Sequence, residues 1–228
     1  MKLRHAAALE PTQLSHRLFC LAEAVPKNRL KHYSYFLIRP EGNLLFHPLK
    51  KTSLLKRFEN WFAESGGIAL QVLTHDAEAS KSCDWMYQRF RAGLYLHASD
   101  LPNVVRKSTC PVAKAFSSGH RLDDEVEAIP LSGHTLGFTA FRIKTPSGVF
   151  LLTGDFLVPT RAGWTANVYK LLMRVGIAHL NALKAIAFDA ALPNMSKGTA
   201  NPPFRLSPEE RIRAIDEAVS RLTSQRPL

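Results

Sequence analysis

The order of the predicted secondary-structure elements indicates an α+β fold in which two sheets pack together with helices on the outside. Short apolar runs typical of strands fill residues 18–47 and return at residues 126–153. Segments with helical spacing lie between these two sets and again after the second. Strands and helices grouped in this way fit a sheet sandwich with outer helices. No linker separates the groups, so we expect a single domain over residues 1–228.

The first half of the chain combines strands with two helices. Strands are expected at residues 18–24, 33–38, 44–47, 68–73 and 93–97, and helices at residues 53–65 and 81–90. The helix at 53–65 has apolar residues at helical spacing and stops at Gly66 and Gly67, which end helices readily. The strand at 68–73 is almost wholly apolar, so we expect both of its faces to be covered.

The second half begins with strands and ends with helices. Strands are expected at residues 126–131, 139–144 and 149–153, then a helix at 167–183 and a short strand at 185–188. Ser207 stands before Pro208, and Glu210 follows three residues after Ser207. This pattern predicts a helix that begins with Ser207 as its N-cap and a reciprocal bond to Glu210.

The composition is that of a globular protein, with 46% hydrophobic and 21% charged residues. No uninterrupted apolar run reaches about 18 residues, so we expect no transmembrane helix. The N-terminal apolar stretch is short and broken by Glu10, which disfavours a signal peptide and predicts a cytoplasmic location. Cys20, Cys83 and Cys110 are far apart and form no CxxC pair, so buried free thiols are expected rather than disulfides or a zinc knuckle.

The net charge of +11 raises the question of a nucleic-acid or membrane partner. The lysines and arginines are scattered, and we find no nucleic-acid-binding motif. A solvated basic surface is therefore favoured, and a small anionic substrate or ligand fits the charge equally well.

Two segments near the middle of the chain place a side chain that can bind a metal beside glycine, next to an apolar run. His134 lies between Gly133 and Thr135, and Asp155 follows Gly154. Imidazole and carboxylate ligands together suit an ion such as zinc or iron. The pattern indicates a cleft at the end of a sheet, where strand-end loops present functional residues.

Four segments in order along the chain resemble motifs of the metallo-β-lactamase superfamily. They are the hairpin that ends at residues 44–48, the strand 70–73 followed by Thr74-His75, the Gly-His-Thr-x-Gly loop at 133–137, and the Thr-Gly-Asp loop at 153–155. The resemblance covers roughly residues 18–198. It implies a four-layer αββα sandwich with hydrolase chemistry, and it implies His75, His134 and Asp155 as metal ligands.

The sequence departs from that family at several ligand positions. Counted from His75, the His-x-His-x-Asp-His motif has Ala77, Ala79 and Ser80 at its remaining positions, and the later Pro-Gly-His loop has Asn194 in its place. The aspartate of the motif orients the attacking water in the family, so its usual base is missing here. Glu78 lies next to the missing aspartate and is the candidate catalytic base. Glu78, Asp76 and Asn194 are also candidate supplementary ligands.

Three ligands can hold one zinc with an open position for water, but they cannot hold a pair of ions. The resemblance therefore implies a hydrolase-like protein with at most one zinc or iron ion. A metal-bound water would act on a small ester, thioester or phosphoester, with weak turnover expected. The alternative is a metal-free binding module, a pseudoenzyme that keeps the cleft for an anionic ligand or a protein partner.

In that alternative, each of the three residues has a structural role. His75 then caps the helix nearby, His134 hydrogen-bonds a neighbouring loop, and Asp155 accepts backbone N–H bonds in a tight turn.

Overall fold

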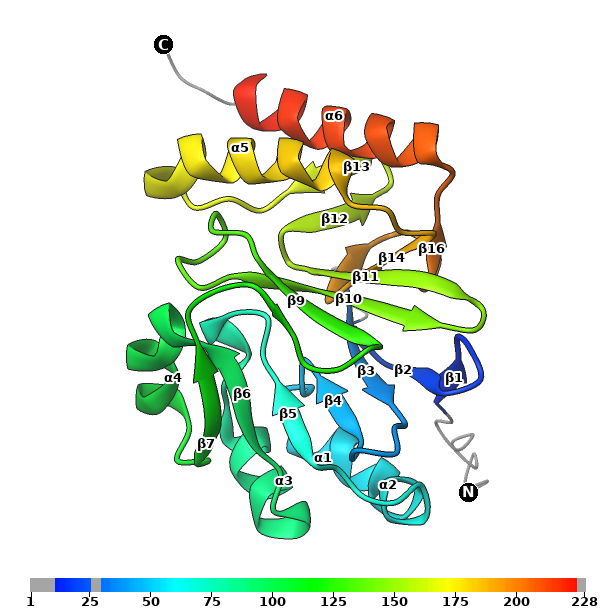
Figure 1. The fold of residues 1–228 in the computed structure, drawn as a ribbon, viewed down its shortest axis with the longest axis vertical. Coiled ribbons are helices and arrows are strands. Elements are labelled where there is room, and N and C mark those ends of the chain that lie inside the picture. The colour runs from blue at the N-terminus through cyan, green and yellow to red at the C-terminus, as the bar shows by residue number, and fades with distance from the viewer. Residues whose placement is uncertain (1–10, 26–29, 225–228) are drawn as a thin grey trace, which may run out of the picture.

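The computed structural model describes residues 11–25 and 30–224, and they form four layers: helices, sheet, sheet, helices (Figure 1). The first sheet contains β1 (Thr12–Gln13), β2 (Leu18–Val25), β3 (Leu30–Leu37), β4 (Leu44–Phe46), β5 (Leu70–Val72), β6 (Gly93–His97), β7 (Val112–Phe116), β12 (Leu157–Thr160), β13 (Gly163–Ala166) and β15 (Met195–Lys197). The second sheet contains β8 (His120–Arg121), β9 (Val126–Pro130), β10 (Thr139–Thr145), β11 (Gly148–Gly154), β14 (Ala190–Pro193) and β16 (Phe204–Arg205).

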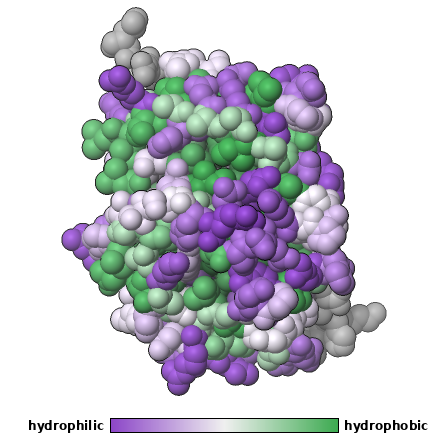
Figure 2. All heavy atoms as spheres, in the orientation of Figure 1, coloured by the Kyte–Doolittle hydropathy of each residue, from purple (hydrophilic) through white to green (hydrophobic). Residues whose placement is uncertain are grey.

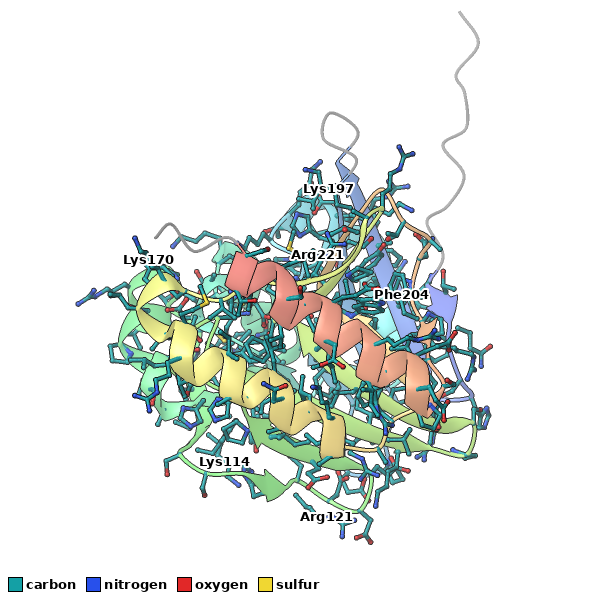
Figure 3. All side chains as sticks on the ribbon, turned by 90° about the horizontal axis from the view of Figure 1, so that it is seen from above. Lys114, Arg121, Lys170, Lys197, Phe204 and Arg221 are labelled. Carbon is teal, nitrogen blue, oxygen red and sulfur yellow. The ribbon has the colours of Figure 1, made fainter. Side chains whose placement is uncertain are left out.

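The outer layers are formed by six α-helices of the described chain. They are α1 (Thr52–Leu55), α2 (Glu59–Glu64), α3 (Lys81–Phe90), α4 (Leu101–Lys107), α5 (Met173–Ala182) and α6 (Pro208–Ser224). The helices α1 to α4 cover the first sheet, and α5 and α6 lie side by side over the second, where α6 also packs against β13 at the edge of the first sheet (Figures 1 and 3). The predicted α+β sandwich with outer helices is therefore confirmed.

Alternation along the strands decides which side chains enter which layer. In β3, Tyr35 and Leu37 face the core between the two sheets, whereas Phe36 packs under α1 and α2. The core between the sheets is completed from the second sheet by residues such as Phe141 and Leu152. Because the side-chain period of a strand is two, both faces of such a strand must be apolar when helices cover one and a second sheet covers the other.

The predicted boundaries hold at some elements and fail at others. The helix α3 and the strand β6 have the predicted bounds. The helix expected at residues 53–65 is instead divided into α1, a 3-10 turn (Lys56–Phe58) and α2. The one expected at 167–183 begins later, with a 3-10 turn (Lys170–Leu172) that leads into α5.

The strand expected at residues 185–188 is wrong. The chain makes a 3-10 turn (Leu183–Ala185) there, and the strand β14 begins at Ala190 and pairs in parallel with β11. Ile186 and Phe188 are apolar because they pack in the core beneath α5 and α6, not because they belong to a strand. A short apolar run indicates burial and does not by itself distinguish a strand from a buried turn.

The beginning of α6 has the predicted cap. Ser207 Oγ accepts a hydrogen bond from the backbone N–H of Glu210 at 3.2 Å, and the Glu210 carboxylate accepts one from the backbone N–H of Ser207 at 2.8 Å. Both groups would otherwise be unpaired donors at a helix start. All three cysteines are free and buried, as predicted. Within residues 11–25 and 30–224, no helix has the length and apolar character needed to cross a membrane.

Candidate metal centre

The three side chains predicted as metal ligands meet at one edge of the sandwich. His75 follows β5 in the first sheet, while His134 lies between β9 and β10 and Asp155 follows β11 in the second. Asp155 Oδ2 is 3.5 Å from His75 Nε2 and 3.8 Å from His134 Nε2. One ligand atom from each residue lies within 4.8 Å of the others, and no other group of three such residues in the described chain comes together in this way.

Backbone contacts hold these loops together. The Thr139 N–H donates to the Thr74 carbonyl at 2.8 Å, which joins the segment before His75 to the start of β10. The Asn194 N–H donates to the Gly154 carbonyl at 3.0 Å, which fixes the turn before Asp155. The segment before His75 is thus joined to the strand that follows the His134 loop, and the turn before Asp155 is held by the segment that carries Asn194.

Gly154 is required by its conformation and by its neighbours. Its φ is +54°, and a Cβ there would lie 2.7 Å from the Phe138 ring and 2.9 Å from Thr74 Oγ1. A left-handed backbone with so little space favours glycine alone. We expect Gly154→Ala to lower the free energy of unfolding by about 1–3 kcal/mol.

Gly154→Ala is also expected to weaken metal binding, because Asp155 would have to shift. Urea denaturation and zinc titration of the same preparation would measure both effects. Unchanged stability would show that this turn does not need glycine. Gly119 is an exposed comparison site without a positive φ; a Cβ there would lie 3.3 Å from the Ala128 carbonyl oxygen, so Gly119→Ala should cost less than Gly154→Ala.

Both histidines have their Nδ1 atoms occupied by a fixed partner. His134 Nδ1 is 3.0 Å from the Asn167 carbonyl, which can only accept, so Nδ1 carries the proton. His75 Nδ1 is 2.9 Å from Glu78 Oε1. Nε2 of each ring therefore faces Asp155, and its lone pair can bind a metal ion once that nitrogen carries no proton. A histidine that binds a metal typically donates its other N–H in this way.

Glu78, the predicted catalytic base, is completely buried. Its carboxylate accepts a hydrogen bond from the Thr74 N–H at 2.8 Å and lies 3.0 Å from His47 Nδ1 as well as beside His75. The Thr74 hydroxyl and the Asn194 amide also donate to it. Burial raises the pKa of Glu78, but the positive charges of His47 and His75 outweigh burial and hold that pKa far below its usual range.

The other two candidate supplementary ligands are engaged elsewhere. The Asp76 carboxylate accepts from Asn103 Nδ2 at 2.6 Å and pairs with Lys107 Nζ at 3.2 Å, so it is directed toward α4. Asn194 is buried, and its amide nitrogen donates to Thr74 Oγ1 at 3.0 Å in addition to Glu78. Asp76 does not belong to the group formed by the three candidate ligands.

The two histidines differ in their affinity for a proton. Burial lowers the pKa of His75, but the negative charges of Glu78 and Asp155 outweigh it and raise that pKa above its usual value. Burial lowers the pKa of His134, and the positive charge of His75 lowers it further. His75 therefore holds the proton of the pair, and a metal ion has to displace it.

Sequence reasoning missed Asp100 and two further histidines near the centre. Asp100 accepts hydrogen bonds from the Gly137 N–H at 2.9 Å and the Thr135 hydroxyl at 2.8 Å, so it holds the loop that carries His134. His32 and His47 come from β3 and from the end of β4. His47 has a φ of +52°, which no local pattern in the sequence indicates.

Two cavities border the centre. The first cavity, of about 370 Å³, is lined by Glu23, His32, His47, Leu49, Lys50, Lys51, His75, Ala77 and Asp155. The second cavity, of about 460 Å³, is lined by Asp76, Ser99, Asp100, Asn103, His134, Thr135, Leu136, Tyr169, Leu171 and Leu172. Glu78 lines neither of them, because its carboxylate is turned toward the interior.

Comparison with known proteins finds similarity in structure only. No protein-family model and no curated protein matches the sequence. The subclass B3 metallo-β-lactamase of Bradyrhizobium japonicum is 16% identical, with a TM-score of 0.69 over 95% of this chain and 93% of that one. A metallo-β-lactamase from Pontibacter korlensis is 15% identical, with a TM-score of 0.71 over 95% and 100% of the two chains.

A third solved structure is similar to this chain to a comparable degree. The metallo-β-lactamase GOB-18 of Elizabethkingia meningoseptica is 12% identical, with a TM-score of 0.64 over 96% of this chain and 92% of that one. The similarity extends over nearly the whole length of each chain, and it includes both sheets and the outer helices. The chain therefore has the metallo-β-lactamase fold.

Proposed function

We propose that the protein is a hydrolase-like protein that binds one zinc or iron ion through His75, His134 and Asp155 and acts on a small ester, thioester or phosphoester. The observation that carries this proposal is the orientation of the two imidazoles. Each Nδ1 faces a fixed acceptor, so each Nε2 is presented to Asp155. A histidine that binds a metal through one nitrogen typically donates the other N–H to a fixed acceptor in this way.

The separations of the donor atoms fit a single ion. Ligand distances of about 2.0–2.1 Å place the donors of a tetrahedral zinc site about 3.3 Å apart. The His75–Asp155 and His134–Asp155 separations of 3.5 and 3.8 Å need only small side-chain adjustments to reach that value. The side chains of His134 and Asp155 are 16% and 19% exposed, so a small molecule can reach them.

Among the described residues, the positions that hold a second ion in the family offer no free ligand here. Ala77 and Ala79 offer no donor atom, and Ser80 is hydrogen-bonded to Ser82 at 2.8 Å. Asn194 is turned toward Glu78. These features support a site that holds one ion at most.

The chemistry expected of the site follows from its remaining groups. A bound ion of this class lowers the pKa of a water ligand toward about 7 and so supplies a nucleophile near neutral pH. Asp155 and the two imidazoles would hold the ion, and Asp100 fixes the loop that carries His134. Because Ala79 stands where the family has its water-orienting carboxylate and Glu78 is buried, we expect slow turnover. General acid–base assistance typically contributes about 100- to 10,000-fold.

A metal-free binding module is the second candidate function. The observation that favours it is the contact between His75, which holds a proton, and Asp155, because this pair can neutralise its own charge without an ion. In that case the cavities would bind an anionic ligand without turnover.

Metal analysis distinguishes the two candidates. Protein purified without chelator and dialysed should contain close to one equivalent of zinc or iron per chain by plasma mass spectrometry. Substituted cobalt should show the absorption bands of a site with nitrogen and oxygen ligands. A content near two equivalents would contradict the single-ion site. Absence of any bound ion at micromolar zinc would support the binding module instead.

A further inference from the structure

The two cavities meet at the candidate metal centre. The first includes His75 and Asp155 in its lining, and the second includes His134. The rings of His75 and His134 lie edge to face with centroids 4.5 Å apart. A ligand whose reacting bond lies over the three side chains would therefore extend into a cavity on either side.

The first cavity has two exposed lysines at its mouth, beside Glu23. Lys50 and Lys51 follow β4 and are exposed where they line it. Among the described residues Lys50 has no carboxylate partner within salt-bridge distance, and Lys51 Nζ is 4.0 Å from Glu23 Oε1. Burial lowers the pKa of His32 in the same cavity, and the positive charges of His47 and Lys50 lower it further, while two carboxylates partly offset them.

The second cavity has an apolar rim. Leu136, Tyr169 and Leu171 line it with exposed fractions of 61%, 64% and 88%. Figure 2 shows apolar residues grouped over the beginning of α5, and Figure 3 shows Lys170, which lies between Tyr169 and Leu171, directed outward at that end of the helix. Grouped apolar side chains at the mouth of a cavity are typical of a binding site.

The lining of the second cavity contains two carboxylates and no lysine or arginine. Asp76 and Asp100 both contribute to its lining. The Asp76 carboxylate is paired with Lys107, but the Asp100 carboxylate is held by hydrogen bonds from Thr135 and Gly137 and has no lysine or arginine partner within salt-bridge distance in the described chain. An anionic group would be repelled there and attracted to Lys50 and Lys51.

We propose that the site takes an amphiphilic anionic substrate, an ester or thioester whose apolar acyl group lies against Leu136, Tyr169 and Leu171 and whose leaving group carries a carboxylate or phosphate toward Lys50 and Lys51. This substrate class rests on the proposed function. Hydrolysis would add water across the acyl bond, so that the acyl group leaves as a carboxylic acid and the anionic part leaves as an alcohol, phenol or thiol. The substrate-binding part of the proposal can be tested without turnover.

Four amides that are not readily hydrolysed distinguish the contribution of the acyl chain to binding from that of the anionic group. They are para-(octanoylamino)benzoate, para-(acetylamino)benzoate and the two corresponding benzamides, which lack the charge. Isothermal titration of the purified protein should show the octanoyl benzoate as the tightest ligand. Loss of the long acyl chain should weaken binding about tenfold or more. Loss of the carboxylate should weaken it about three- to tenfold, less so at high salt.

Variants at the two cavities test which cavity recognises the carboxylate and which recognises the long acyl chain. The double variant Lys50→Ala with Lys51→Ala should remove the preference for benzoate over benzamide, and Leu171→Ser should reduce the preference for octanoyl over acetyl. Lys144→Ala, an exposed lysine toward the other end of β10, and Ile212→Ser, on α6 with 41% exposure, are the matched controls and should change neither preference. All five positions are at the surface or on the rim, so folding should be retained.

The possible results distinguish a failure of the proposed substrate class from a failure of the hydrolase proposal. Equal binding of the four amides, or preferences that the two cavity variants do not alter, would overturn the substrate class. If the amides bind as expected but the matching octanoyl ester is not hydrolysed by zinc-loaded protein, the substrate-binding inference holds and the hydrolase proposal fails. If the ester is hydrolysed without either preference, the hydrolase proposal holds and the amphiphile inference fails.

Discussion

His134→Ala is expected to lower the affinity for zinc by about a hundredfold or more, because it removes one of only three ligands. Competition with a chromophoric chelator would measure the dissociation constant. The His134 side chain is 16% exposed, and its hydrogen bond to the Asn167 carbonyl can be replaced by water. Stability should therefore change little, and the loss of affinity can be assigned to the ligand itself.

The control for this measurement is a histidine outside the centre. His16 is exposed and does not belong to the group of ligands, so His16→Ala should bind zinc as the wild type does. If His134→Ala bound zinc with unchanged affinity, the centre would have to be assigned to other residues. If the wild type itself bound none, the metal-free alternative would be supported.

Glu78→Gln is expected to have the largest effect on stability of any single change considered. The buried carboxylate lies between His47 and His75, and removal of one member of a buried ion pair typically costs about 3–5 kcal/mol. Glutamine keeps the size of the side chain, so the loss would be caused by the charge. Because Glu78 also faces Nδ1 of His75, we expect zinc affinity to fall about 10- to 100-fold.

An exposed ion pair supplies the matched control. Glu59 and Arg89 form a salt bridge with side chains 32% and 46% exposed, so Glu59→Gln should cost no more than about 1 kcal/mol. Urea denaturation of both variants near pH 6 would give the comparison. If Glu78→Gln were as stable as the wild type but had lost all hydrolytic activity, Glu78 would be the catalytic base rather than a residue that positions His75.

The pH dependence of stability provides a further measurement of the same ion pair. The pKa of Glu78 is lowered in the folded state, so its contribution is present above the unfolded value of about 4.3 and is lost as the pH falls. The pKa of His75 is raised, so its contribution is complete below the unfolded value of about 6.5 and is lost as the pH rises through the folded value. The advantage of the wild type over Glu78→Gln should therefore be greatest between about pH 4.3 and 6.5.

Much of the fold could be predicted from local sequence patterns, and the three candidate ligands from these patterns together with the family resemblance. The nearly all-apolar run at residues 68–73 predicts a strand covered on both faces, because successive side chains of an extended chain point to opposite sides. The cap at Ser207 is equally local. His134 and Asp155 are identifiable because the glycines beside them allow tight loops at the ends of strands.

The tertiary structure alone decided what surrounds those ligands. Glu78 is adjacent in sequence to a position that faces the site in the family, yet a 3-10 turn (Asp76–Glu78) directs its carboxylate into the interior between His47 and His75. Asn194 joins the same cluster from 116 residues away. Contacts between residues so far apart in sequence depend on how the two sheets pack, and no local periodicity predicts them. The sequence by itself thus determined the layers and the three candidate ligands, whereas only the packed sandwich decided the charge of each cavity and the inward orientation of Glu78.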